Sequence, residues 1–250
     1  MANAVETQPK RAVFLSAEWR DLVMLNYEVA PALLQDYVPS GTELDSFQGK
    51  TFVSLVGFRF LRTKLFGFAP IPFHTDFDEV NLRFYVRRRE GDMLKRGVVF
   101  IREIVPKRAI AFVARVVYGE NYACHPMRHS IQVEEAGATA DYSWKLSCRW
   151  CRIRARASGS PVLPGEGSLE QFISEHYWGY AAQRGGSSEY QVKHVPWRVW
   201  KCSDASFEGD GGSLYGHVIG MALRRPPDSA FIAEGSAVQV LAGRRIANAK

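Results

Sequence analysis

The sequence predicts an α+β, mainly β fold, and the spacing of its apolar residues is the first reason. Runs rich in β-branched and aromatic residues recur along the chain, as at 51–60, 79–86 and 97–105. Such runs are typical of strands, and most are separated by turns of hairpin length, which favours antiparallel pairing. Helical spacing is confined to a few short segments. We therefore expect about ten strands in an antiparallel sheet that curls into a barrel or cone, with a few peripheral helices.

The N-terminal part is expected to begin with a flexible tail over residues 1–12, which is polar. Residues Ala17–Tyr27 mix large apolar and polar side chains and predict a short helix that runs into a strand. Pro31–Tyr37 predicts a short helix, because proline fits the first helical position. Thr51–Phe60 predicts a central strand, apolar on both faces, in which Gly57 marks a bulge or a close approach of another segment.

The remainder of the chain predicts further strands and one helix. The strands are expected at Gly97–Val105, Ala109–Tyr118, Ser130–Glu134, Tyr142–Ala157, Tyr190–Val199, Leu214–Ile219 and Ala230–Leu241. Ser168 and Gln171 form a capping box, and apolar side chains follow at helical spacing up to Tyr180. The sequence therefore predicts a helix that starts at Leu169 and includes Tyr180.

The segment Glu79–Val86 alternates strictly between apolar and polar side chains, which is the period of a strand. One face carries Val80, Leu82, Phe84 and Val86, and the other carries Glu79, Asn81, Arg83 and Tyr85. A row formed by a carboxylate, an amide, a guanidinium and a phenol either meets solvent or lines a polar cavity. Which of these settings applies decides what the protein does.

Composition and charge are those of a globular protein, with 46% hydrophobic and 23% charged residues in a chain of 250. We expect one domain over residues 13–250. The net charge of +6 suits an anionic small molecule and does not by itself argue for nucleic acid. The polar N-terminus and the lack of a long apolar run predict neither a signal peptide nor a membrane partner. A cytoplasmic protein is expected, and a homo-oligomer is compatible with the sequence.

Metal and cofactor motifs are missing from the sequence, so we expect neither a metal nor a cofactor. It contains no GxGxxG, P-loop, GxSxG or HExxH pattern. Cys148 and Cys151 form a CxxC pair within the strand predicted at Tyr142–Ala157, where their sulfurs would point to opposite faces. His176 falls on the apolar face of the predicted helix and is expected to be a core histidine.

Several blocks of the sequence together resemble one family. They are Tyr37–Asp45 (YVPSGTELD), Val53–Phe58 (VSLVGF), Glu79–Val86 (EVNLRFYV), Ala114-Arg115, Ser168–Glu170 (SLE), His194–Trp197 (HVPW) and Ala233–Ser236 (AEGS). In this order, and over nearly the whole chain, they resemble the YqjF-like uncharacterised conserved proteins, which are grouped with the acetoacetate-decarboxylase-like superfamily. The resemblance implies a cone-shaped antiparallel β-barrel with a central funnel. It implies no particular function.

The resemblance also concerns the Schiff-base lysine of the decarboxylases, which follows a glutamate on an early barrel strand. Glu79 matches that glutamate. In one register Lys107 matches the lysine, but the motif then lacks its glycine and its spacing is short. In the other register Arg115 matches the motif arginine, and Tyr122 stands where the lysine would be. We favour the second register, because it preserves the intervening hairpin and leaves Lys107 in a turn.

The register has a chemical consequence, because a Schiff base requires a primary amine of lowered pKa. With Tyr122 at that position, the resemblance implies the scaffold without the decarboxylation chemistry. The first hypothesis is therefore a funnel that binds a small organic molecule with an anionic or carbonyl group. Glu79, as acid or base, and Arg83, as partner of a carboxylate, are its candidate catalytic residues. The candidate ligand-binding residues are Asn81, Tyr85, Arg115 and Tyr122.

Three alternatives remain open at this stage. Glu79 and Arg83 would form a structural ion pair that plugs the barrel, because such pairs also perturb pKa values. A lyase acting on a keto acid would use Lys107. A protein-interaction module would use the exposed aromatic loop that carries Phe66, Phe68 and Phe73.

Overall fold

The computed structural model describes residues 11–70, 74–107 and 121–247. The strand predicted at Ala109–Tyr118 lies outside these ranges, and so does Arg115. Phe73 and the first ten residues of the predicted tail also lie outside them.

Strands make up most of the described chain and join one large sheet. They are β1 (Val13–Val29), β2 (Glu43–Leu44), β3 (Thr51–Leu65), β4 (Ala69–Pro70), β5 (Phe77–Glu90), β6 (Met93–Val105), β7 (Tyr122–Cys124), β8 (Met127–Glu134), β9 (Gly137–Leu146), β10 (Arg149–Ser158), β11 (Trp178–Gln183), β12 (Gly186–Lys193), β13 (Val199–Glu208), β14 (Ser229–Leu241) and β15 (Arg244–Ala247). The helical segments are η1 (Pro31–Leu33), η2 (Gln35–Tyr37), α2 (Leu169–Ser174), α3 (Gly211–Tyr215) and α4 (His217–Ala222). The predicted mainly β fold with a few helices is confirmed.

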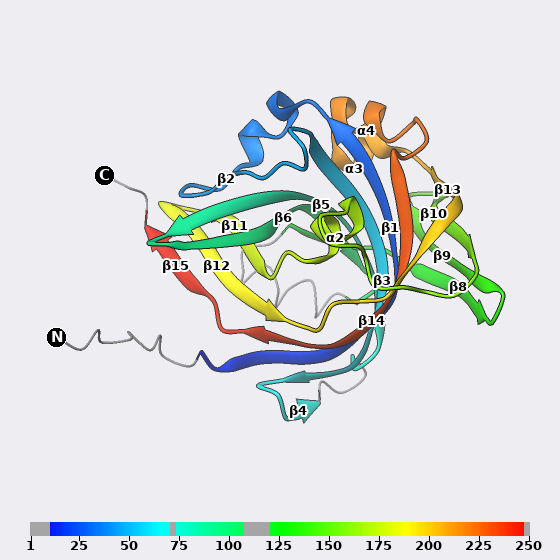
Figure 1. The fold of residues 1–250 in the computed structure, drawn as a ribbon, viewed down its shortest axis with the longest axis horizontal. Coiled ribbons are helices and arrows are strands. Elements are labelled where there is room, and N and C mark those ends of the chain that lie inside the picture. Colours follow the sequence, from blue (N-terminus) through cyan, green and yellow to red (C-terminus); the bar gives the residue numbers. More distant parts are fainter. Residues whose placement is uncertain (1–10, 71–73, 108–120, 248–250) are drawn as a thin grey trace.

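Seven strands pair in a closed ring, in the order β12-β11-β6-β5-β3-β1-β14, with β14 returning to β12. The closure consists of the pairs Val192–Val240 and Lys193–Gln239. Neighbours in the ring are antiparallel except β6 and β11, which run parallel. The remaining long strands β13, β10, β9 and β8 continue from β14 and lie beside the ring in Figure 1. The predicted curled sheet therefore closes on itself, with one parallel joint.

Two apolar cores follow from the alternation of the ring strands. Val80, Leu82 and Phe84 of β5 face outward and pack against the apolar side of β9 and β10. The opposite faces of the same strands turn inward, where a second, aromatic-rich core fills the ring. Gly57 of β3 lies at the contact of the two layers, because a Cβ atom there would lie 2.5 Å from Ile153 Cδ1. The predicted close approach at Gly57 is thus confirmed.

The helix predicted at the start of Ala17–Tyr27 is wrong, because β1 is extended throughout. A bulge explains the helix-like spacing. Asp21 has a φ of 57°, and the register against β3 shifts between Arg20 and Val23. The extra residue turns both Trp19 and Leu22 toward the inner core, so apolar side chains recur after three residues instead of two.

The helix expected to include Tyr180 ends at Ser174, and Tyr180 belongs to β11. Its N-terminus is as predicted, because the Ser168 side chain accepts a hydrogen bond from the Gln171 backbone N–H at 3.2 Å. The residues beyond Ser174 are rich in aromatic side chains, which favour strands, and Trp178 pairs with β6 instead of continuing the helix.

Two further expectations in the C-terminal half are wrong. The strand predicted at Leu214–Ile219 is replaced by α3 and α4, whose apolar side chains pack into the outer core. A short apolar run does not distinguish a strand from a buried helix. The single strand expected at Tyr142–Ala157 is the hairpin β9–β10, so Cys148 lies in its turn and only Cys151 lies in a strand. All four cysteines are free.

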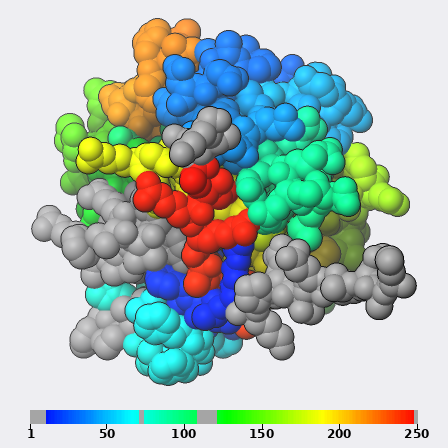
Figure 2. Space-filling model, turned by 90° about the vertical axis from the view of Figure 1, so that its left-hand side faces the viewer, coloured from blue at the N-terminus to red at the C-terminus, as the bar shows by residue number. Residues whose placement is uncertain are grey.

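The two ends of the described chain meet on one side of the ring. Val13 at the start of β1 pairs with Leu241 at the end of β14, and β15 follows on the same face (Figures 1 and 2). In Figure 2 the red C-terminal segment lies between the blue N-terminal strand and the green-blue β5–β6 hairpin. Among the described residues, no helix combines the length and apolar character needed to cross a bilayer.

Candidate functional site

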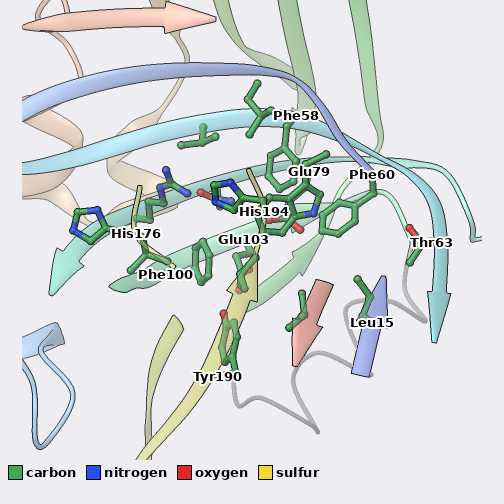
Figure 3. A pocket seen from close by; sticks show the side chains of 18 of the residues that line it. Leu15, Phe58, Phe60, Thr63, Glu79, Phe100, Glu103, His176, Tyr190 and His194 are labelled. Carbon is green, nitrogen blue, oxygen red and sulfur yellow. Dashed lines mark hydrogen bonds between the residues drawn. The ribbon is translucent and has the colours of Figure 1, made fainter. Parts of the chain in front are cut away.

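A cavity of about 190 Å³ lies in the aromatic-rich core inside the ring. Ten aromatic side chains line it, namely Phe14, Trp19, Phe58, Phe60, Phe77, Phe100, Tyr122, Trp178, Tyr190 and Trp197. Polar side chains enter this wall from several elements. In Figure 3, Glu79 of β5 and Glu103 of β6 lie close to His194, which follows β12, while His176, which follows α2, lies farther along the wall at the left.

Strand β5 supplies the polar side of the cavity, as its alternation predicts. Glu79, Asn81 and Arg83 all line the cavity, with exposed fractions of 2%, 2% and 9%. Tyr85 continues the same face but lies just beyond the lining residues, where its hydroxyl is 2.6 Å from Ser54 Oγ. The row of polar groups therefore faces a closed interior and not solvent.

Glu79 is held by two neutral donors. Asn81 Nδ2 donates to Oε1 at 2.9 Å, and the Tyr122 hydroxyl donates to Oε2 at 3.2 Å. Burial raises the pKa of the Glu79 carboxyl to about 7, although both hydrogen bonds and the charge of Arg83 act in the opposite direction. Burial likewise raises the pKa of Tyr122 well above its usual value, so this hydroxyl stays a donor. Glu79 therefore changes its protonation state near neutral pH.

Arg83 is a buried cation without a carboxylate partner among the described residues. One guanidinium nitrogen donates to the Ile173 carbonyl oxygen at 3.1 Å and lies 3.8 Å from Met24 Sδ. Its Nε has no partner in the described chain. Within the same residues no ion pair joins Arg83 to Glu79, so the predicted plug of these two side chains is not what fills the ring. A buried charge is costly unless it is paired.

His176 lies beside Arg83 on the wall that the α2 segment forms. Its Nε2 is 3.2 Å from Asp45 Oδ2, and Asp45 also accepts two hydrogen bonds from Arg96, at 2.7 and 3.2 Å. The ring packs on Tyr85, with ring centres 4.7 Å apart. His176 is buried, as expected, but it is not the fully satisfied core histidine that the sequence predicts, because its Nδ1 has no partner in the described chain.

Unpartnered polar atoms gather around this cavity. Within the described chain, buried side-chain atoms without a hydrogen-bond partner include Trp19 Nε1, Thr63 Oγ1, Asn81 Oδ1, Arg83 Nε and His176 Nδ1, all on lining residues. Native proteins rarely leave such atoms without partners, because each costs free energy. Such atoms are therefore concentrated on the lining residues of one cavity.

The two residues that competed for the lysine position lie apart. Tyr122 of β7 lines the cavity and contacts Glu79, which agrees with the register that we favour. Lys107 follows the end of β6, is partly buried and is not among the lining residues. Of the lysines in the described ranges, none lines the cavity.

The other residues predicted for a site lie away from the cavity or outside the described residues. Arg115 lies outside the described residues. Phe66 and Phe68 are exposed in the β3–β4 turn, and Phe73 lies outside the described residues, so the interaction loop stays a prediction. In the described ranges, no three His, Cys, Asp or Glu side chains gather closely enough to hold a metal ion.

Sequence reasoning missed Glu103, His176 and His194 as members of the site. Glu103 reaches the cavity because a register shift in the β5–β6 pairing breaks the alternation of β6. His194 stacks on Trp197, with ring centres 4.1 Å apart. The sequence block His194–Trp197 (HVPW) is one of those on which the family resemblance rests. That resemblance was the only feature of the sequence that pointed to His194.

Comparison with solved structures supports the fold. Acetoacetate decarboxylase from Legionella pneumophila subsp. pneumophila str. Philadelphia 1 is similar with a TM-score of 0.66, over 99% of this chain and 98% of that one, at 14% identity. The enduracididine biosynthesis enzyme MppR has a TM-score of 0.66 at 14% identity, over 99% and 92% of the two chains. An acetoacetate-decarboxylase-like enzyme from Sphingomonas wittichii RW1 has a TM-score of 0.64 at 13% identity, over 99% and 100%. At such identities the likeness shows the fold alone.

Sequence comparison identifies the family. The protein YqjF of Bacillus subtilis (strain 168), named there as uncharacterized, is 26% identical over 182 residues, which is 72% of each chain. The model of DUF2071, described as an uncharacterized conserved protein, matches residues 16–237, which include five strands of the ring in full and most of β1 and β14. The predicted YqjF-like resemblance is confirmed, and the chain belongs to the DUF2071 family, with an acetoacetate-decarboxylase-like fold.

Proposed function

We propose that the cavity inside the ring binds a small organic molecule that carries a carboxylate or a similar anionic group. The observation that carries this proposal is Arg83, a guanidinium that is 9% exposed, lines the cavity and has no carboxylate partner among the described residues. Arginine binds carboxylates with two parallel, charge-assisted hydrogen bonds. An anion in the cavity would offset the cost of burying this cation.

Glu79 does not take the place of that anion. Its carboxyl is bonded to Asn81 and Tyr122 and not to Arg83, and burial raises its pKa to about 7, so the carboxyl is only partly ionised near neutral pH. A neutral carboxyl leaves the charge of Arg83 uncompensated. The cavity is therefore selective for a negative ligand, which would in turn meet a protonated Glu79 as a hydrogen-bond donor.

The aromatic wall defines the rest of the ligand. A cavity of about 150 Å³ is enough for benzene, so the volume of about 190 Å³ suits a molecule slightly larger than one ring. Trp19, Phe58 and Phe100 would cover its apolar part. MppR, which has a similar fold, is known in complex with pyruvate, a small carboxylate, and this supports an anionic ligand.

The chemistry open to the bound molecule is acid–base chemistry. No lysine of the described chain lines the cavity, so imine formation with Lys107 is not part of this proposal. A carboxyl group with a pKa of about 7 donates and accepts protons efficiently at neutral pH. Glu79 is therefore the proton-transfer group in any reaction that the site performs.

Isothermal titration of the full chain with matched pairs of ligands tests the proposal. Phenylacetate and its uncharged analogue phenylacetamide differ only in the group that Arg83 would bind. We expect phenylacetate to bind at least about tenfold more tightly, and the variant Arg83→Gln to lose this difference. Arg87→Gln is the control, because Arg87 lies on the same strand but pairs with Glu43 at the surface. Equal affinity for acid and amide, or no binding of either, would refute the proposal.

A further inference from the structure

His176 presents a hydrogen-bonding nitrogen to the cavity in one fixed protonation form. Its Nε2 edge is turned to Asp45, which does not line the cavity, and its Nδ1 is left without a protein partner. The side chain is only 7% exposed, so bulk water does not satisfy this nitrogen. Whether Nδ1 donates or accepts is decided by the groups behind the ring.

Asp45 fixes the tautomer of His176. Burial alone would raise the pKa of Asp45, but its bonds to His176 and Arg96 outweigh burial and hold that pKa well below its usual range. The ionised carboxylate is only an acceptor, so His176 Nε2 must carry the proton. Burial also lowers the pKa of His176, and together with the nearby charges of Arg96 and Arg83 it outweighs the hydrogen bond and charge of Asp45, which raise that pKa. The ring is therefore neutral, and Nδ1 offers a lone pair.

This acceptor lies close to the proposed anion site. Arg83 bonds to the carbonyl of Ile173, three residues before His176. The guanidinium carbon is 5.8 Å from the centre of the Tyr85 ring, and the His176 ring centre is 4.7 Å from the same point. The unpaired guanidinium of Arg83 and the unpartnered Nδ1 of His176 therefore belong to side chains that both lie near Tyr85. Arg83 and His176 also line the same cavity, where a ligand would meet both side chains.

We propose that the ligand is a hydroxy acid, with its carboxylate on Arg83 and its hydroxyl donating to Nδ1 of His176. This inference rests on the proposed function and narrows it from organic acids in general to those with a hydroxyl group near the carboxylate. A keto acid presents a carbonyl oxygen, an acceptor, to the lone pair of Nδ1 and is repelled. An acid with hydrogen at that carbon leaves Nδ1 unpartnered, which costs affinity. His176 is in this role a specificity-determining residue.

Three ligands of nearly equal shape distinguish a hydroxy acid from a keto acid and from an acid that carries neither group. Mandelate carries the hydroxyl, benzoylformate carries a carbonyl at the same carbon, and phenylacetate carries neither. Isothermal titration with the full chain should give mandelate an affinity about tenfold higher than either of the others. The longer series of 3-phenyllactate, phenylpyruvate and 3-phenylpropionate should show the same order if the ring extends further along the aromatic wall.

Two variants test the assignment to His176. In His176→Gln the side-chain amide can still donate to Asp45, but the acceptor corresponding to Nδ1 is lost, so mandelate should bind no better than phenylacetate while phenylacetate keeps its affinity. In Asp45→Asn the position of Asp45 Oδ2 still faces both His176 Nε2 and Arg96 Nε, but it no longer carries a carboxylate charge. The proton is then held less firmly on Nε2, so the preference for mandelate should shrink. Thermal unfolding verifies that each variant is folded.

The outcomes distinguish this inference from the proposed function. If the three acids bind equally well, or if benzoylformate binds best to the unchanged protein, the hydroxy-acid assignment is wrong while anion binding stands. A preference for mandelate that survives in His176→Gln would assign the recognition to another residue and would also overturn it. If none of these acids binds to the folded protein, the proposed function itself fails.

Discussion

Glu79 shows how burial changes the pKa of a carboxyl group. Removal from water raises its pKa, and two neutral hydrogen bonds and one cation recover only part of the lost solvation. A carboxyl group of this kind costs stability when it is ionised. Proteins retain such costs at sites where the altered pKa is used, which makes Glu79 a functional candidate with a measurable signature.

That signature is a stability difference that depends on pH. The folded pKa of about 7 lies above the ordinary value of 4.5, so the neutral form is the one that the folded state favours. The free-energy cost of ionising the buried Glu79 is absent below pH 4.5, grows between pH 4.5 and 7, and is complete above pH 7. In Glu79→Gln this cost is absent, so the stability of the variant relative to the unchanged protein should rise by about 3 kcal/mol between pH 4.5 and 8.

Urea unfolding at pH 5, 6, 7 and 8 measures this difference. Glu43→Gln serves as the control, because Glu43 is an exposed partner of Arg87 at the molecular surface. Its effect should stay small and should not grow as pH rises. A difference between Glu79→Gln and the unchanged protein that is constant across this range would show that burial does not perturb the carboxyl.

At the same scale, the periodicity of the sequence revealed only those site residues whose signal is local, and Tyr122 was found through the family resemblance. Glu79, Asn81 and Arg83 were predictable because strict alternation assigns a face to each residue of a strand. His176 was predicted to be buried, but its partner Asp45 lies 131 positions away in the sequence. The spacing of apolar residues carries no information about such a pair, so the fixed tautomer of His176 emerges only from the fold.

The elements deviate from their predicted form wherever a strand leaves its regular period. The bulge at Asp21 in β1 and the register shift in the β5–β6 pairing both change which side chains face inward. The bulge in β1 turns Trp19 toward the cavity, and the register shift between β5 and β6 turns Glu103 toward it. Periodicity predicted the regular part of β3, Thr51–Phe60, and most of β5, and it failed at β1, which contains the bulge. The irregularities that defeat prediction are thus those that shape the cavity.

Packing between elements is tested most directly at Gly57, where β3 meets β9 and β10. A Cβ atom there would lie 2.5 Å from Ile153 Cδ1 and 2.8 Å from the Tyr142 ring, which is closer than atoms can approach. Gly57→Ala should therefore lower the unfolding free energy by about 1–3 kcal/mol, as overpacked core positions do. Gly165→Ala is the control, because no atom lies within 4 Å of a Cβ atom at that position.

A second substitution makes this prediction specific. Ile153→Val removes the δ carbon that Gly57→Ala would meet, so the double variant should be more stable than the sum of the two single effects implies. Denaturant unfolding of the four proteins gives the coupling free energy, which should be about 1 kcal/mol in favour of the double variant. Strictly additive effects would show that the layers are not packed against each other at Gly57.

At the scale of the whole molecule, the ring is closed by few backbone pairs and supported by one buried carboxylate. Only two residue pairs join β12 to β14, and two join β11 to β6. Glu189 of β12 is fully buried and accepts hydrogen bonds from cations on four other segments, namely Arg11, Arg88, Lys95 and Arg244, as well as from the Tyr180 hydroxyl. Side chains here join strands that the backbone connects sparsely.

Replacing Glu189 should therefore destabilise the whole ring. Glu189→Gln leaves the buried Lys95 ammonium with Glu90 as its remaining carboxylate partner, and breaking a buried pair costs about 3–5 kcal/mol. Burial raises the pKa of Glu189, but the bonds from Lys95 and Arg11 outweigh burial and bring the pKa below 4.5. This lowered pKa adds stability that is present above pH 4.5 and is lost as the pH falls through the folded value. The variant should thus lose less stability than the unchanged protein on acidification from pH 5 to pH 3.

An exposed lysine–glutamate ion pair is the control for the substitution of Glu189. Lys50 and Glu28 form an ion pair at 2.7 Å, with side chains 56% and 40% exposed, and Glu28→Gln should cost no more than about 1 kcal/mol. Urea unfolding at pH 7 and at low pH gives both quantities for both variants. If Glu189→Gln costs no more than Glu28→Gln, the buried carboxylate does not hold the ring closed, and the sparse backbone pairs must do so alone. If it costs more but keeps the same acid sensitivity, Glu189 acts through packing and not through its charge.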